Sequence, residues 1–406
     1  MTHFALQHAS LELRMPVRPP APHNFALRSK PREPSLLLPA GAATCPYGAA
    51  NMAALVLGAT APGQALGVRR RLRLQRACFA SGRRLAPQQA TAGLSGAGQQ
   101  PELEVKSEAW LWRGHRVSYE RVSGGVSGDD RRPPLCVVHG FGSSARHFRS
   151  LTTALAAQGY TVYAPDLLGF GASAKPATAY SPTLWAQQVA AFLEEVVGED
   201  PCCLIGNSIG SQVAVIVAST APKHVAGLAL LNCAAGMNQR NLYGDDPTLA
   251  ALAPVFWLVE VLLKTKPIAR FLFNAFRSKA NVRQILEQQV YKRPARVTDE
   301  LVETLYGPSE DDGALDVFVE VFTGDPGPRP EPLAQTLGQP IKVIWGALDS
   351  WTPADGTVAR AFRQLASAKP QQVEFDTIAN CGHVPYDDAP EDVAALLLPW
   401  LARLKR

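Results

Sequence analysis

The chain contains little cysteine, and its cysteines are not arranged for metal binding. Seven are spread over 406 residues, and their spacing matches no zinc or iron–sulfur pattern. Three of them, Cys136, Cys202 and Cys203, lie in apolar runs, where cysteine usually serves as a small buried hydrophobic residue. We therefore expect no metal site, no cofactor and a reducing compartment.

Long apolar runs are also missing. The most apolar stretch, 250–263, is interrupted by Glu260 and is shorter than the roughly 20 residues that a membrane-spanning helix needs. We expect this stretch to form a lid helix or a helix at an interface. The chain is then either soluble or bound to a membrane surface.

Acidic residues are scarce in the first hundred positions, which hold eleven arginines and Lys30 but only Glu12 and Glu33. Alanine, proline and glycine are abundant there. An Arg-rich, acid-poor leader is typical of an organelle transit peptide, and we interpret residues 1–100 as a transit peptide and disordered leader. Composition leaves three alternatives open: a mitochondrial rather than a chloroplast address, a plain disordered tail, and a true start at Met52.

Residues 101–406 have the composition of one folded domain. They carry the remaining 28 basic and 33 acidic residues, so this part of the chain is mildly acidic. A nucleic-acid partner requires a basic surface, and we expect none. With 47% hydrophobic residues, the chain is long enough to bury one large core.

A Gly-x-Ser-x-Gly motif, GNSIG at 206–210, follows the apolar run 202–205, and a small-residue stretch begins directly after it. The order strand, sharp turn, helix is the one in which such a serine, here Ser208, serves as a nucleophile. The flanking glycines let the strand and the helix approach each other closely. Chance supplies this pentapeptide often enough that the rest of the chain must decide its meaning.

Strand-like and helix-like stretches alternate on both sides of the motif. Strands are expected at 135–138, 160–164, 202–205, 227–231, 341–345 and 372–375, helices at 148–158, 183–197, 359–365 and 391–404, and an opening hairpin at 110–120. Such alternation with short loops predicts an α/β fold with a mostly parallel sheet flanked by helices. An apolar insert with helical periodicity, about 237–335, interrupts it and predicts a helical lid.

Two loops after the insert supply partners for Ser208. Asp349 follows the strand expected at 341–345, and His383 follows the last strand. Taken singly, the aspartate is more often a helix cap and the histidine structural, but the order Ser, Asp, His is that of serine hydrolases with this architecture. We expect Asp349 to hold the imidazole, while His383 takes the Ser208 proton and returns it to the leaving alcohol.

Backbone amides are predicted to stabilise the oxyanion. We expect those of Phe141, in the turn after the strand 135–138, and Ile209, directly after the nucleophile, to donate to it. His139 is predicted to order the first of these turns through hydrogen bonds. A serine, not an aspartate, at the sharp turn favours ester hydrolysis through an acyl-enzyme over epoxide or halide chemistry.

Several segments carry a family resemblance. HGFGSS (139–144), GNSIGS (206–211) and CGHVPYDD (381–388) resemble the α/β-hydrolase superfamily. Two longer segments, FLEEVVGEDPCCLIGNSIGS (192–211) and GALDVFVEVFTGDPGPRP (313–330), are similar to plant chlorophyll dephytylases and the related pheophytinases. The similarity extends over roughly 105–405, lid included, and the leader does not share it.

This resemblance implies an α/β-hydrolase fold with its triad at Ser208, Asp349 and His383. It implies a chloroplast enzyme, in the stroma or at the stromal face of the thylakoid membrane, that removes phytol from chlorophyll or pheophytin. The expected partners are this hydrophobic ester and, peripherally, the thylakoid membrane. Two alternatives stay open: a general lipase or esterase acting on plastid acyl lipids, and a non-hydrolytic ligand binder with the same fold.

Overall fold

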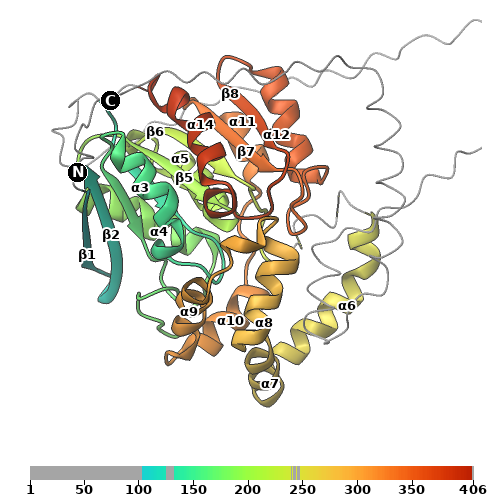
Figure 1. The fold of residues 1–406 in the computed structure, drawn as a ribbon. Helices are drawn as coiled ribbons and strands as arrows, with labels where there is room; N and C mark the ends of the chain where they lie inside the picture. The colour runs from blue at the N-terminus through green and yellow to red at the C-terminus, as the bar shows by residue number, and fades with distance from the viewer. Residues whose placement is uncertain (1–102, 125–131, 239, 241–243, 245–246, 405–406) are drawn as a thin grey trace, which may run out of the picture. The chain divides into compact units, whose positions relative to one another are not determined.

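An eight-stranded sheet in the order β1-β2-β4-β3-β5-β6-β7-β8 forms the centre of the fold (Figure 1). The computed structural model describes residues 103–124, 132–238, 240, 244 and 247–404, all within the structural unit Cys45–Arg406. The leader predicted at 1–100 lies outside the described residues.

The sheet begins with an antiparallel hairpin and continues in parallel. Its strands are β1 (Leu103–Trp112), β2 (His115–Gly124), β3 (Leu135–Val138), β4 (Val162–Pro165), β5 (Cys202–Asn207), β6 (Val225–Leu231), β7 (Ile341–Gly346) and β8 (Val373–Ile378). β2 pairs antiparallel with β1 and β4, and the remaining neighbours are parallel. The hairpin is longer than the predicted 110–120, and the α/β fold with a mostly parallel sheet is confirmed.

Helices cover both faces of this sheet because successive strand residues point to opposite sides. Leu135 and Val137 of β3 pack with α3 (Arg149–Ala157) and α14 (Pro390–Leu401). On the opposite face the core contains residues of α4 (Pro182–Phe192), α5 (Ile209–Thr220) and α12 (Thr357–Ala368). The helix predicted at 183–197 is α4 followed by one π turn, Leu193–Val197.

Between β6 and β7 the chain forms a helical insert. Its helices are α6 (Pro247–Leu263), α7 (Lys266–Arg277), α8 (Lys279–Ile285), α9 (Asp299–Tyr306), α10 (Ala314–Thr323) and α11 (Pro330–Thr336). Figure 1 shows α7 to α10 grouped beyond the ends of the strands, with α6 to one side. A separate small core of Leu263, Phe273, Ala314, Phe318 and Phe322 holds α6, α7 and α10 together.

Hydrogen bonds join the two ends of the insert and fix its exit to the sheet. The Asn238 side-chain amide donates to the Gly324 carbonyl at 2.8 Å. From α5, the Gln212 amide donates to the carbonyls of Pro326, at 2.8 Å, and Pro328, at 2.9 Å. The two prolines lie in the segment that follows α10, so the Gln212 bonds attach this segment to α5.

Among the helices that the structure describes, none has the length and apolar content to cross a membrane.

A substitution at Gly210 tests whether the close approach of α5 to the sheet stabilises the fold. A Cβ atom there would lie 2.0 Å from the Val138 carbonyl oxygen, so alanine must push the helix away. We expect Gly210→Ala to lower the free energy of unfolding by about 3 kcal/mol or more, measured by urea denaturation. Gly338→Ala is the matched control because no atom lies within 4 Å of its added Cβ. Equal unfolding midpoints for the two variants would contradict this explanation.

Candidate active site

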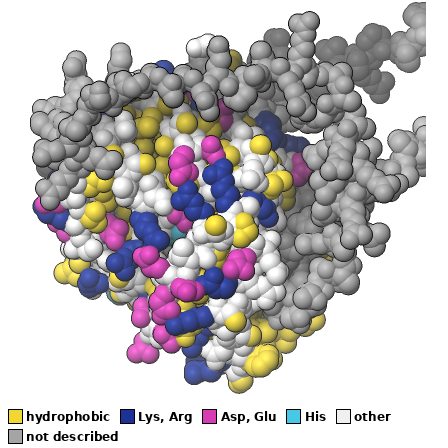
Figure 2. All heavy atoms as spheres, viewed as in Figure 1, with side chains coloured by type: hydrophobic (Ala, Val, Ile, Leu, Met, Phe, Trp, Pro, Cys, Tyr) yellow, Lys and Arg dark blue, Asp and Glu magenta, His cyan; other side chains and the backbone are white. Residues whose placement is uncertain are grey.

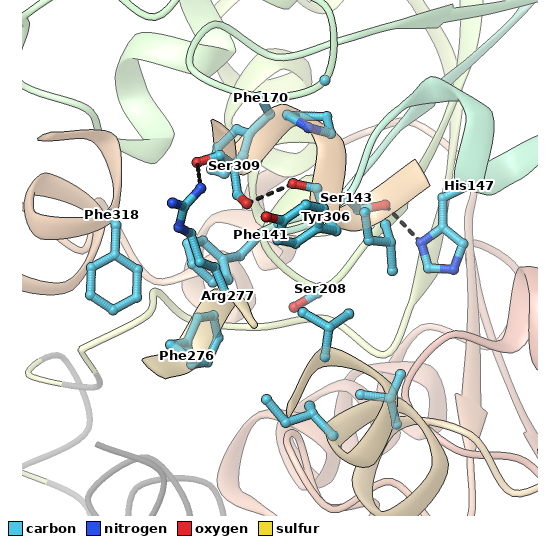
Figure 3. Close-up of a pocket in the computed structure, with 18 of the residues that line it drawn as sticks. Phe141, Ser143, His147, Phe170, Ser208, Phe276, Arg277, Tyr306, Ser309 and Phe318 are labelled. Carbon is cyan, nitrogen blue, oxygen red and sulfur yellow. Dashed lines mark hydrogen bonds between the residues drawn. The ribbon is translucent and has the colours of Figure 1, made fainter. Parts of the chain in front are cut away.

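Ser208 occupies a sharp turn between β5 and α5. Its backbone has φ 55° and ψ −120°, a region that residues other than glycine avoid at a cost of about 1–3 kcal/mol. Backbone hydrogen bonds hold it there: its N–H donates to the Leu231 carbonyl, at 3.0 Å, and its carbonyl accepts from Ala234, at 3.1 Å. The turn brings the Ser208 side chain to the wall of a pocket (Figure 3).

Asp349 and His383 meet beside the same pocket. Asp349 lies in the loop after β7 and His383 in the loop after β8, and Asp349 Oδ2 is 2.8 Å from His383 Nδ1. His383 and Ser208 both line the pocket. The structure therefore pairs the predicted acid with the Nδ1 side of the predicted base, and it places this base and Ser208 at the same pocket.

The Asp349 carboxylate is buried but well supplied with donors. Oδ1 accepts from the backbone N–H groups of Trp351, at 2.7 Å, and Thr352, at 3.1 Å. Burial alone would raise the pKa of Asp349. The charge of His383 and side-chain hydrogen bonds from His383, Thr352 and Asn232 outweigh burial and hold this pKa below its ordinary value of 3.8. The group is therefore a carboxylate at neutral pH, able to fix the orientation of His383.

Asn232, which the sequence analysis missed, joins the loops that carry the acid and the base. Its amide donates to Asp349 Oδ2 at 2.6 Å and to the Gly382 carbonyl at 3.3 Å, and its Oδ1 accepts from the Gly346 N–H at 3.1 Å. Its φ is 47°, a conformation that asparagine tolerates better than most residues. In the sequence, the only sign of this role is that Asn232 is a polar residue directly after the apolar strand 227–231.

Asn207, for which sequence reasoning gave no account, ties the nucleophile to the base. Its side-chain amide donates to the His383 carbonyl, at 3.0 Å, and to the Leu231 carbonyl, at 3.2 Å. A buried amide needs such partners. The residue next to Ser208 therefore fixes the backbone of the loop that carries the imidazole.

The two amides predicted to stabilise the oxyanion lie next to Ser208 along the chain or in space. Ile209 is the first residue of α5, where N–H groups have no acceptor within the helix. Gly140, which precedes Phe141, packs so closely that an added Cβ would lie 3.1 Å from Ser208 Cβ. Phe141 itself lines the pocket. The oxyanion hole stays a prediction that agrees with this placement.

His139 orders the turn before Phe141, as expected. Its Nδ1 lies 2.8 Å from the Gly140 carbonyl, and its Nε2 accepts from the Leu167 N–H at 2.9 Å. These partners require the neutral imidazole with its hydrogen on Nδ1. Burial lowers the pKa of His139 to about 4, so the ring stays neutral at physiological pH.

A second buried network, also missed from the sequence, borders the pocket around His147. His147 Nδ1 lies 2.9 Å from both Ser143 Oγ and Tyr386 Oη, and Nε2 lies 2.7 Å from Tyr291 Oη. Tyr291 donates to Asp387 at 2.6 Å, so His147 Nε2 donates to Tyr291 and Nδ1 accepts. Burial lowers the pKa of His147 to about 4.

The pocket measures about 200 Å³ and is mainly apolar. Figure 3 shows aromatic side chains from the core and the insert around it, with Ser208 at one wall. They include Phe141, Phe170, Phe276 and Phe318. A polar group also reaches it, because Arg277 lines the pocket while donating to the Ser309 carbonyl at 2.9 Å. The lining of this pocket suits a hydrophobic ligand with a few polar atoms.

A strand–serine–helix turn on such a sheet, with an acid and a histidine on later loops, defines the α/β-hydrolase class. The model of the alpha/beta hydrolase family matches residues 137–396. The chain belongs to this family, and the protein is a hydrolase of the α/β-hydrolase type.

Relatives of known name include a plant enzyme and a bacterial one. The chain is 26% identical over 326 residues to pheophytinase, a chloroplastic protein of Arabidopsis thaliana; the match covers 71% of this chain and 65% of that protein. It is 26% identical over 297 residues to lipase 3 of Moraxella sp. (strain TA144). This match covers 72% of this chain and 83% of that protein.

Solved structures share the fold. The epoxide hydrolase CorEH is 23% identical, with a TM-score of 0.58 over 74% of this chain and 99% of its own. At that identity the likeness concerns the fold alone.

Acidification should destabilise the protein through His139 and His147. Both have a pKa of about 4 in the folded chain, against 6.5 ordinarily, because burial disfavours the charged ring. Between these values the unfolded chain binds protons that the folded chain excludes. The free energy of unfolding is therefore highest above about pH 6.5 and falls as the pH falls towards 4.

Urea denaturation across this pH range measures the effect. His147→Gln, which cannot titrate, should show a shallower fall than the unaltered protein, by up to about 1.4 kcal/mol per pH unit. Identical pH dependences would show that His147 is protonated equally in the folded and unfolded chains.

Proposed function

We propose that this protein is a serine carboxylic-ester hydrolase that removes phytol from chlorophyll or pheophytin in the chloroplast. The observation that carries the hydrolytic part is the Asp349–His383 hydrogen bond of 2.8 Å beside a pocket whose wall includes Ser208. The phytyl substrate is supported by the sequence resemblance, by the chloroplastic pheophytinase among the relatives and by the aromatic pocket lining. The Arg-rich composition of residues 1–100 supports the location.

In the proposed mechanism, Ser208 Oγ attacks the ester carbonyl carbon while His383 Nε2 takes the hydroxyl proton of Ser208. The resulting oxyanion accepts hydrogen bonds from the amides of Phe141 and Ile209. Asp349 stabilises the imidazolium. Collapse of the intermediate breaks the bond to the alkoxy oxygen, and His383 delivers the proton to the departing phytol.

A water molecule completes the cycle. His383 takes a proton from this water, whose oxygen attacks the acyl carbon on Ser208. Collapse breaks the bond between the carbonyl carbon and Ser208 Oγ, and the proton returns to the serine. The products are the free tetrapyrrole carboxylic acid and phytol.

A second function deserves testing because of a specific relative. Lipase 3 of Moraxella sp. matches the chain over a similar length and at the same identity as pheophytinase. A lipase or esterase acting on plastid acyl lipids would use the same serine, acid and base. Only the group that fills the apolar pocket would differ.

Incubation of the purified protein with chlorophyll a and with pheophytin a, followed by chromatography of the products, separates these functions. We expect free phytol from at least one of the two. Hydrolysis of a short acyl ester without phytol release from either substrate would favour the lipase or esterase. The absence of activity on all three would contradict hydrolysis.

Ser208→Ala should lower kcat by about ten thousandfold or more, because members of such a triad act as a unit. Ser219→Ala is the matched control, since Ser219 is an exposed residue of the same helix, α5, and should leave kcat unchanged. Labelling with a fluorophosphonate should follow the same pattern. A Ser208→Ala variant with ordinary turnover would overturn the mechanism.

Asn232→Gly isolates the amide that supports Asp349. Glycine accepts the positive φ at this position, so the change removes the hydrogen bonds but not the turn. Loss of a hydrogen bond to a charged group costs about 1.5–3 kcal/mol, and we expect kcat to fall roughly ten- to a hundredfold with little change in KM. Unaltered kcat would show that the neighbouring donors hold Asp349 without Asn232.

A further inference from the structure

Helices α6 and α7 carry large apolar side chains on their outer surface. Trp257 of α6 is 64% exposed and Phe271 of α7 is 72% exposed, and Leu258 and Val261 are exposed on the same helix as Trp257. Figure 2 shows hydrophobic side chains gathered at the end of the molecule where Figure 1 places α7 and the adjoining end of α6. These four residues are called the α6–α7 surface below. Large apolar side chains exposed together on adjoining helices mark an interaction site.

Basic residues accompany the α6–α7 surface. Lys264, Lys266 and Arg270 are all exposed, in the turn between the helices and on α7. Among the described residues from 247 to 277 the acidic ones are limited to Glu260, which pairs with Arg240 at 2.8 Å. Among the described residues of α6 and α7, the surface therefore combines exposed aromatic and aliphatic groups with an excess of positive charge.

The opposite side of α7 belongs to the candidate active site. Phe273 and Phe276 point inward from this helix, pack with Phe318 of α10 and line the pocket. Arg277, at the end of α7, lines it as well. One helix thus separates the exposed apolar surface from the pocket that contains Ser208.

We propose that the α6–α7 surface binds an anionic lipid bilayer. Trp257, Leu258, Val261 and Phe271 would enter the region between headgroups and acyl chains, with the lysines and Arg270 against the lipid phosphates. Tryptophan and phenylalanine next to lysine and arginine are the composition of helices that lie in a membrane interface. Each basic residue close to an anionic surface adds to the attraction.

This geometry also gives the pocket a route to its substrate. An ester dissolved in the bilayer would meet α7 first and reach the pocket along it, a consequence that rests on the proposed function. Binding to the bilayer does not rest on it, because vesicle binding is measured without turnover.

The first test replaces the apolar side chains. Full-length Trp257→Ser/Phe271→Ser and the unaltered protein are floated with vesicles of phosphatidylcholine and phosphatidylglycerol. The partition coefficient should fall about tenfold or more. Val105→Ser/Leu111→Ser is the matched control, since both residues are exposed apolar side chains of β1, and it should bind as the unaltered protein does.

The second test reverses charge. Lys264→Glu/Lys266→Glu should lower binding to the same vesicles by at least about tenfold and have a smaller effect on vesicles of phosphatidylcholine alone. Lys223→Glu/Arg360→Glu reverses two exposed basic residues outside the insert and should leave binding unchanged. The basic leader is common to all these proteins and contributes equally to each.

Circular dichroism establishes that each variant is folded before its binding is compared. The proposal fails if the unaltered protein does not bind the anionic vesicles, or if the α6–α7 variants bind like their controls. It also fails if the surface joins two copies of the chain, so that Trp257→Ser/Phe271→Ser abolishes a dimer in gel filtration and leaves vesicle binding unchanged. Vesicle binding without phytol release would refute the proposed substrate and leave this inference standing.

Discussion

Two buried side-chain amides at the ends of neighbouring strands hold the candidate site together. Asn207 ends β5 and reaches the backbone of His383, whereas Asn232 follows β6 and reaches the Asp349 carboxylate. Each spans loops that are far apart in the sequence. In a buried site an amide without partners costs about 1–3 kcal/mol, so these bonds favour one arrangement of the loops. The strained turn at Ser208 persists because its surroundings are fixed in this way.

The fold could be predicted from the sequence because its signals are local. Buried strands of four to seven residues, short loops and a Gly-x-Ser-x-Gly turn each occupy one short stretch. Chain order then placed Ser208, Asp349 and His383 at the same edge of a parallel sheet, where the structure has them. The exact ends of elements were harder, as in the opening hairpin, which was expected at 110–120 and is formed by Leu103–Trp112 and His115–Gly124.

What could not be predicted depends on contacts across long separations. The His147 network joins residues 96 to 239 positions apart, and neither periodicity nor spacing marks such partners. Asn207 stands next to Ser208, and Asn232 follows an apolar strand. Their acceptors belong to other loops, so their roles could not be predicted from the sequence. The same limit applies to the insert: its apolar content predicted helices, and only the structure separates the side of α7 that lines the pocket from the exposed one.

The hydrogen bond between Asn238 and Gly324 has an architectural consequence. It brings together two positions of the insert that are 86 residues apart. Between them the insert also supports the loop that carries His383, because the Val290 carbonyl accepts from the His383 N–H at 2.9 Å and Tyr291 donates to Asp387 at 2.6 Å. Lengthening, shortening or replacing such a segment adds little to the entropy of loop closure. A change of substrate within this architecture can therefore proceed by altering the helices between β6 and β7, as long as the segment at Val290 and Tyr291 that supports the His383 loop is kept.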